Sequence, residues 1–324
     1  MNVRRLIPTA AVAGAVALGL TALSACSSSD AAEGGGDGKL DVVASFYPMQ
    51  FLAEEIGGTH VSVTTLTKPG AEPHDLELSP RQIGGLGDAD YILFLKGVQP
   101  AVDDAVAQAG VKNTVDAAKL TTLESHGSEV DGHGHEAGEE HGGEEHGHED
   151  TGLDPHIWLD PVKYAEVAAG VGKSLEKADP GNAADYRKNT DTLVTELKSL
   201  DTAYRTGLKD AATRTFITTH SAFGYLAERY GLTQEGIAGI DPEAEPSPAR
   251  IDEIHTAAEK SRATTVFFET LASDRTARTL AKDLGLKTAV LDPLEGITDK
   301  SAGADYIEVM KSNLTALQKA LGAK

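Results

Sequence analysis

Two regions of the chain alternate between short apolar segments and longer amphipathic ones. The short segments are rich in β-branched residues, as expected of strands, and they cover 40–46, 60–66 and 91–95 in the first region and 215–219, 264–269 and 288–291 in the second. Between them, apolar residues recur at helical spacing over 50–56, 81–87, 222–231 and 274–285. This alternation predicts an α/β fold in which mainly parallel sheets carry helices on both faces.

A long helical pattern separates the two regions. Residues 182–208 contain no proline and a single glycine near the end. Apolar residues recur along one face of this segment: Tyr186, Leu193, Leu197, Leu200, Tyr204 and Leu208. A helix of about 27 residues spans about 40 Å, which is the length of a whole lobe. We therefore expect two (β/α) lobes, over 39–180 and 210–324, joined by one linking helix over 181–209.

The first residues have the features of a secretory signal peptide. Two arginines are followed by an alanine-rich apolar run over 10–23. The motif Leu-Ser-Ala-Cys then ends at Cys26 and resembles the bacterial lipobox, in which cleavage leaves a lipid-modified cysteine. The alternatives are an ordinary signal peptide or a single membrane anchor, although the run is short for a span of about 20 residues. We expect a signal peptide over 1–25, a lipidated Cys26, a flexible tether over 26–38 and a protein anchored to the outer face of the plasma membrane.

Charge and cysteine content limit the classes of ligand and partner. The formal net charge is −21, and residues 124–150 contribute ten acidic side chains and no basic ones. Such a balance argues against nucleic acid as a partner and suits a cationic ligand. Cys26 is the only cysteine, so the folded part has neither a disulfide nor a thiolate ligand.

The acidic segment over 124–150 also holds six of the chain's eleven histidines. Glycine, acids and histidine cannot bury enough apolar surface to order a backbone, so we expect a disordered loop within the N-terminal lobe. Imidazoles and carboxylates bind divalent metals, which predicts auxiliary low-affinity metal binding. The histidines concerned are His126, His133, His135, His141, His146 and His148. The alternative is a solvated acidic spacer.

Three of the other histidines lie where an ordered site can form. His74 and His156 lie in proline-bracketed loops ahead of helix starts marked by a capping residue and proline, and His220 ends a buried strand. Ligands of open α/β sheets bind outside the carboxyl ends of strands, so these histidines could meet in a cleft between the lobes. Spacing alone leaves open three unrelated loop histidines. We expect His60 and His255 to be surface or boundary residues.

Seven features in a fixed order make the chain similar to a known family. They are PHDLELSP, the acidic His-rich insertion, DPHIWLDP, TTHSAFGYLAERYGL, GIDPEAEPSPARI, VFFE and LDPLEGIT. With them, the chain resembles the zinc/manganese branch of the solute-binding proteins, which are lipoproteins that deliver metal to ABC transporters. The resemblance implies two (β/α) lobes joined by one long helix, with the metal site in the cleft between the lobes.

The same resemblance implies that His74, His156 and His220 are direct metal ligands. Manganese and iron members have a carboxylate where His220 stands, whereas zinc members have histidine. Imidazole suits zinc, while harder, carboxylate-rich sites suit manganese. The resemblance therefore implies that the bound ion is Zn²⁺, carried as a transported ligand.

The fourth zinc ligand is expected from the loop that contains LDPLEGIT. Asp292 directly precedes a proline and is expected to form a turn through its own backbone hydrogen bonds. Glu295 has no evident structural role, and some zinc relatives with the PLEG pattern use this glutamate. Others complete the site with water or with an acid from another loop. We expect Glu295 to be the fourth ligand, with Asp292 and water as alternatives.

The predicted function is capture of Zn²⁺ by a monomer and delivery to an ABC-transporter permease with a cytoplasmic ATPase. No reaction and no catalytic residue are expected. The alternatives are a zinc-dependent surface adhesin, a zinc buffer, or a zinc hydrolase. A hydrolase is less favoured because the chain has no H-E-x-x-H motif, and Glu72 would have to serve as its general base.

Overall fold

The computed structural model describes residues 38–126 and 152–323 of the 324-residue chain. The predicted signal peptide, the lipidated Cys26 and the tether up to residue 37 lie outside the described residues. So does the His-rich segment, except for residues 124–126. The described residues belong to one unit, Gly34–Lys324.

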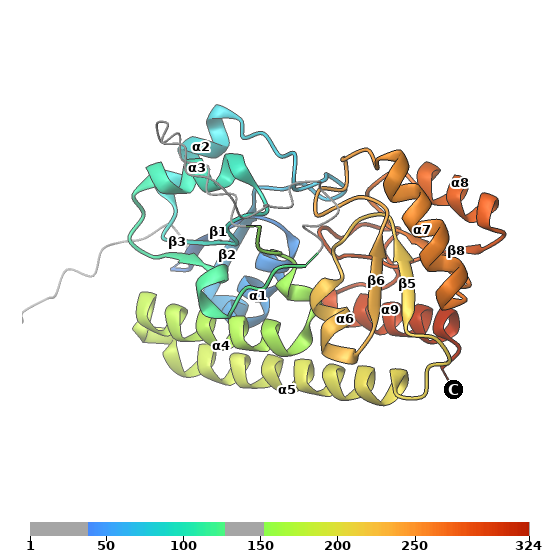
Figure 1. The fold of residues 1–324 in the computed structure, drawn as a ribbon. Coiled ribbons are helices and arrows are strands. Elements are labelled where there is room, and N and C mark those ends of the chain that lie inside the picture. The colour runs from blue at the N-terminus through green and yellow to red at the C-terminus, as the bar shows by residue number, and fades with distance from the viewer. Residues whose placement is uncertain (1–37, 127–151, 324) are drawn as a thin grey trace, which may run out of the picture. The chain divides into compact units, whose positions relative to one another are not determined.

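The fold contains two sheets with the same internal order (Figure 1). The first sheet consists of β1 (Leu40–Ala44), β2 (Val61–Thr65), β3 (Tyr91–Phe94) and β4 (Thr114–Asp116) in the order β2-β1-β3-β4. The second consists of β5 (Thr215–Thr218), β6 (Thr233–Gly236), β7 (Thr265–Phe268) and β8 (Lys287–Val290) in the order β6-β5-β7-β8. All neighbouring strands are parallel, which confirms the predicted fold class of two α/β lobes.

The helices connect these strands and cover the sheets. The first lobe contains α1 (Tyr47–Gly57), α2 (Pro80–Asp88), α3 (Pro100–Ala109) and α4 (Pro161–Ala178). The second contains α6 (Gly224–Tyr230), α7 (Pro248–Ser261), α8 (Arg275–Leu284) and α9 (Tyr306–Leu321). Short 3-10 turns include η3 (Ile157–Leu159). Ser79 is the N-cap of α2 and forms a complete capping box. Asp160 is the N-cap of α4, and its side chain accepts from the backbone N–H of Val162.

Alternate residues of the central strands face different helices. In β1, Val42 and Ala44 belong to one apolar cluster with α1, whereas Val43 belongs to another with α2 and α3. In the second sheet, Phe216 of β5 belongs to the same cluster as Val42 and Ala44. Ile217, the next residue, belongs to a different cluster with α7 and α8. This division follows from the two-residue period of a strand and confirms that helices cover both faces.

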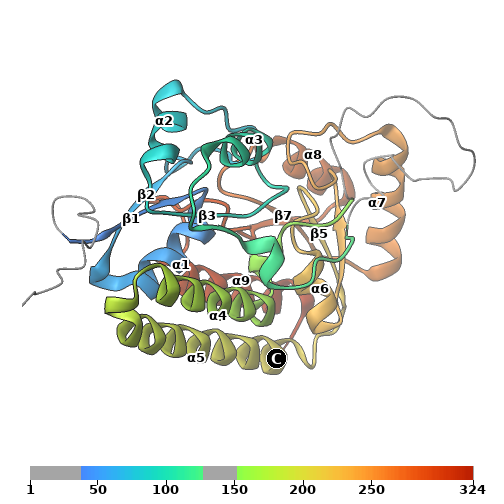
Figure 2. The ribbon, with the colours of Figure 1, turned by 90° about the vertical axis from the view of Figure 1, so that its left-hand side faces the viewer.

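The predicted long helix is α5 (Ala183–Leu208), and it packs against both lobes. Figures 1 and 2 show α5 beside α4 beneath the first sheet, and α5 then continues to the second lobe. It contacts α1 and α4 of the first lobe and α9 of the second. The buried apolar residues of these helices belong to one cluster, so the two lobes share a continuous core along the linking helix. No helix among the described residues is long and apolar enough to cross a membrane.

Candidate metal centre

Four loops bring His74, His156, His220 and Glu295 together. His74 lies between β2 and α2, and His156 directly precedes η3, so both come from the first lobe. His220 follows β5 and Glu295 follows β8, so both come from the second lobe. One potential ligand atom from each of the four residues lies within 4.8 Å of all the others. The structure therefore places all four predicted residues in one cluster between the lobes.

The geometry centres on one carboxylate oxygen. Oε1 of Glu295 lies 3.4 Å from Nε2 of His74, 3.4 Å from Nε2 of His156 and 3.3 Å from Nε2 of His220. These distances are long for hydrogen bonds between nitrogen and oxygen. Two ligand atoms that each lie about 2.0–2.1 Å from a tetrahedral ion are about 3.3–3.4 Å apart. The three distances from Glu295 thus match those in the ligand shell of a four-coordinate ion, and the three imidazole nitrogens lie within 4.8 Å of one another.

The cluster is buried, and several of its polar atoms have no partner. The side chains of His156 and Glu295 are fully buried, that of His220 is 2 % exposed and that of His74 is 10 % exposed. Nε2 of His156, Nε2 of His220 and Oε2 of Glu295 have no hydrogen-bond partner. Buried polar atoms without partners are rare because each is destabilising. A cation at the centre would satisfy the two imidazole nitrogens.

Two further carboxylates hold two of the imidazole rings. Nδ1 of His156 donates to Oδ1 of Asp154 at 2.7 Å. Nδ1 of His220 donates to Oε1 of Glu269 at 2.9 Å, and the same oxygen accepts from the Thr219 hydroxyl at 2.5 Å. An ionised carboxylate can only accept, so in the neutral form of each ring the proton lies on Nδ1 and the Nε2 lone pair is available to an ion at the centre. This carboxylate–histidine arrangement is typical of metal ligands.

The same carboxylates control the pKa values of the centre. Burial by itself lowers the pKa of His156, but the charge and hydrogen bonds of Asp154 outweigh it, and the net pKa is raised. Burial also opposes protonation of His220, but Glu269 and Glu295 raise its pKa well above the usual value. Burial raises the pKa of Glu295, but its three histidine neighbours lower it well below the usual value. Without metal, the centre therefore holds protons on imidazole and a charged Glu295.

Asp292 is close to the centre but has a structural role. Its Oδ1 accepts from the backbone N–H of Leu294 at 2.8 Å, and its Oδ2 accepts from the Thr270 hydroxyl at 3.0 Å. Its own backbone N–H donates to Asn313. The expected turn at Asp292 is therefore present, and it directs the chain so that Glu295 points into the cluster. Glu72, considered as a general base, accepts from the backbone N–H of His74 at 3.2 Å and so shapes the His74 loop.

A bridge between the lobes fixes the segment that carries His156. Nε1 of Trp158 donates to the carbonyl oxygen of Pro293 at 2.7 Å. The hydroxyl of Tyr306 donates to the carbonyl oxygen of Trp158 at 2.5 Å. Pro293 is two residues from Glu295, so this bridge ties the His156 segment of the first lobe to the second-lobe loop that carries the Glu295 carboxylate.

The structure also places His126, the one described histidine of the His-rich segment. Its Nε2 lies 2.9 Å from Oε2 of Glu228, and its ring packs against Tyr225 with centroids 4.5 Å apart. The expectation that nothing fixes the histidines of this segment is therefore wrong for His126. The other five histidines of the segment lie outside the described residues. His60 and His255 are half-buried, and neither belongs to a described cluster of potential metal ligands.

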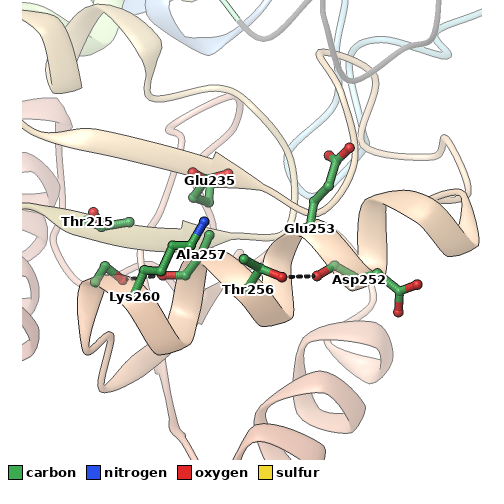
Figure 3. Close-up of a pocket in the computed structure, with 8 residues that line it drawn as sticks. Thr215, Glu235, Asp252, Glu253, Thr256, Ala257 and Lys260 are labelled. Carbon is green, nitrogen blue, oxygen red and sulfur yellow. Dashed lines mark hydrogen bonds between the residues drawn. The ribbon is translucent and has the colours of Figure 1, made fainter.

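A separate pocket lies on the second lobe (Figure 3). It has a volume of about 620 Å³ and is lined by residues of β5, β6 and α7, including Glu235, Glu253 and Lys260. No residue of the metal centre lines it. It therefore has no part in the candidate centre.

Comparisons with known proteins give the family. A family model described as the periplasmic component A of the zinc-uptake complex matches residues 42–320. The chain belongs to this zinc-uptake family. Its members that resemble the chain include the zinc-binding protein AdcA of Streptococcus pyogenes, which is 38 % identical over 294 residues. That match covers 87 % of this chain but 56 % of AdcA, so the chain spans a little over half the length of that relative.

One other member and one isolated domain of a member match over nearly their whole length. The high-affinity zinc uptake system protein ZnuA of Bacillus subtilis is 38 % identical, and the match covers 93 % of this chain and 94 % of ZnuA. The crystal structure of the Zn(II)-bound ZnuA-like domain of Streptococcus pneumoniae AdcA has a TM-score of 0.71 and 33 % identity. It covers 88 % of this chain and 99 % of that domain. That domain shares the two-lobed fold described above.

Proposed function

We propose that this protein captures Zn²⁺ outside the cytoplasm and delivers it to an ABC permease for high-affinity zinc uptake. His74, His156, His220 and Glu295 would be the four ligands. The observation that carries this proposal is the spacing of 3.3–3.4 Å between one Glu295 oxygen and three imidazole nitrogens. Membership of the zinc-uptake family and the zinc-bound structure of a relative support it.

The chemistry of the ligands favours zinc over manganese. Three neutral imidazoles and one carboxylate form a borderline ligand set, whereas manganese prefers sites rich in oxygen. Glu295 offsets one of the two charges of the ion, and the buried Asp154 and Glu269 lie behind the imidazoles. A tetrahedral shell with this ligand set suits zinc, which has no directional preference of its own.

The completeness of the shell argues for transport instead of catalysis. Catalytic zinc has three protein ligands and an open position for water, whereas four protein ligands close the shell. The family is one of zinc-uptake components. We infer that the chain catalyses no reaction and that Zn²⁺ is its cargo.

The cellular setting completes the proposal. A lipid on Cys26 would hold the chain on the outer face of the plasma membrane, and residues 26–38 would act as a tether. The linking helix and the two lobes would form the folded body, and residues 124–150 would add weak metal sites. The permease and its cytoplasmic ATPase would be the partners, and the protein would act as a monomer.

Three measurements test the proposal. Competition titration of the purified chain should give one tight Zn²⁺ site and much weaker Mn²⁺ binding, and X-ray absorption should show nitrogen and oxygen ligands in a four-coordinate shell. In a strain that lacks the gene, the intact chain should restore zinc uptake, whereas a chain with His156→Ala should not. Preference for Mn²⁺, or uptake that does not require the gene, would contradict the proposal.

A further inference from the structure

A second cluster of potential metal ligands lies outside the centre. It consists of Glu124, His126 and Glu228, and one potential ligand atom of each lies within 4.8 Å of the others. Glu124 and His126 lie at the end of the first described segment, and Glu228 lies on α6. Imidazole nitrogen and carboxylate oxygen are the ligand types that zinc accepts.

The imidazole of His126 sits in a built position. Its ring packs edge-on against Tyr225. The absence of a side chain at Gly224 makes the fit possible, since a Cβ there would lie 2.3 Å from Cβ of His126. The Tyr225 hydroxyl accepts from the backbone N–H of Glu124 at 2.8 Å and so fixes the adjacent backbone. Tyr225 therefore fixes both the His126 ring and the backbone at Glu124.

A buried carboxylate points at this imidazole from behind. Oδ2 of Asp154 lies 3.2 Å from Nδ1 of His126, and neither atom has a hydrogen-bond partner. Asp154 is fully buried. Its other oxygen accepts from Nδ1 of His156 in the main centre. One carboxylate thus lies behind one histidine of each cluster, which is the arrangement by which proteins orient metal-binding histidines.

The cluster is accessible to an ion. A cavity of about 850 Å³ is lined by His126, Gly224 and Glu228 together with Ser125 and residues of β6 and α7. The side chain of Glu228 is 61 % exposed, so it can turn toward an ion. Lys163 pairs with Oε1 of Glu124 at 2.6 Å, which leaves the other oxygen of Glu124 for the metal. Water from the cavity can complete the shell.

Resting on the proposed function, in which residues 124–150 add weak metal sites, we propose that Glu124, His126 and Glu228 form a second site for a borderline divalent ion such as Zn²⁺, linked to the main centre through Asp154. Nε2 of His126 binds the ion while its Nδ1–H donates to Asp154. The second site binds more weakly than the main centre because its three side chains are partly exposed and must be ordered when the ion binds.

Calorimetric titration with Zn²⁺ tests this site in a chain that lacks residues 127–150, so that the other histidines of the segment are absent. The expected result is one tight ion and one weaker ion. Glu228→Gln and His126→Ala should each weaken the second event at least about tenfold and leave the first unchanged. Glu259→Gln, an exposed change of the same charge on α7, should alter neither event.

Asp154→Asn tests the link between the sites and should weaken both events. Visible absorption of bound Co²⁺ provides an independent readout. The absorption bands that appear with the second equivalent of Co²⁺ should be missing in the His126→Ala chain. A single binding event, or a second event that survives both His126→Ala and Glu228→Gln, would overturn the second site. If the chain that lacks residues 127–150 shows the weaker event but no tight event, the result contradicts the main centre and supports the second site. The two failures are therefore distinguishable.

Discussion

The two clusters use similar side chains in different surroundings. In the main centre, two of the three imidazoles have a carboxylate bonded to Nδ1, and three of the four residues are buried. In the second cluster, all three residues are partly or fully exposed, and the only imidazole faces Asp154 without a formed hydrogen bond. The comparison shows that ligand type alone does not make a tight site. Burial and orientation before the ion arrives distinguish the two clusters.

The largest effect is expected from removing a histidine of the main centre. His220→Ala removes one ligand and leaves Glu269 buried without its imidazole partner, so Zn²⁺ affinity should fall about a thousandfold or more. Competition titration against a chelator measures the loss. His255→Ala, at a half-buried histidine outside both clusters, is the matched control. A loss of less than about tenfold would remove His220 from the shell.

The next effect separates the two acids of the 292–295 loop. Glu295→Gln should weaken Zn²⁺ about a hundredfold, because it removes the only negative charge among the ligands. Asp292→Asn should chiefly lower the free energy of unfolding of the metal-free chain, by about 1–3 kcal/mol, because it disturbs buried hydrogen bonds. Zinc titration and denaturant unfolding of both variants distinguish these roles. Equal losses of affinity would mean that Asp292 also binds the ion.

Lowering the pH should weaken Zn²⁺ binding at the main centre, and this effect should begin at a higher pH than for ordinary histidine ligands. His156 and His220 have raised pKa values, so they hold their protons up to higher pH than an ordinary histidine, and Zn²⁺ must displace these protons. Affinity should therefore fall as the pH is lowered from about 8 to about 6, by about tenfold per pH unit for each proton released. Chelator competition across this range provides the measurement. A constant affinity would show that the metal-free imidazoles are already neutral.

The smallest effect concerns the second cluster without metal. The pair between His126 and Glu228 is partly exposed, and such pairs contribute about 0–1 kcal/mol. Glu228→Gln should therefore change the free energy of unfolding of the metal-free chain by less than about 1 kcal/mol. Denaturant unfolding with Glu259→Gln as control measures this difference. A larger loss would mean that the cluster has a structural role in the absence of an ion.

The sequence predicted the elements with strong periodicity and missed those without it. Residues 91–95 are apolar, residues 215–219 combine β-branched and aromatic residues, and they form the largely buried strands β3 and β5. In contrast, β4 and β6 have the sequences TVD and TQEG, which carry no apolar run. These strands exist because they extend the edges of sheets that other strands have begun, and a local pattern cannot show this. The long helix was evident, but the core that it shares with both lobes was not.

For the metal centre, the sequence indicated the residues that face the middle but not those behind them. His74, His156, His220 and Glu295 stand in loops at motifs that can be recognised. The supporting acids Asp154 and Glu269 look like ordinary loop residues. Asp154 precedes a proline and lies two residues before His156, and Glu269 follows VFF. Neither context is more than a weak signal that the acid contacts a histidine. Their role depends on a tertiary contact, as does the approach of Glu228 to His126.

The Trp158 bridge sets the order in which contacts at the centre can break. Trp158 and Tyr306 tie the His156 segment to the loop of Glu295, so these two ligands stay together while the lobes keep their shared core. His74 has no such bridge, and its loop contains Gly70 in a left-handed conformation. We therefore expect an ion at the proposed centre to leave first past His74. Loosening this loop should therefore change the rates at which an ion enters and leaves, more than a change at the other three residues would.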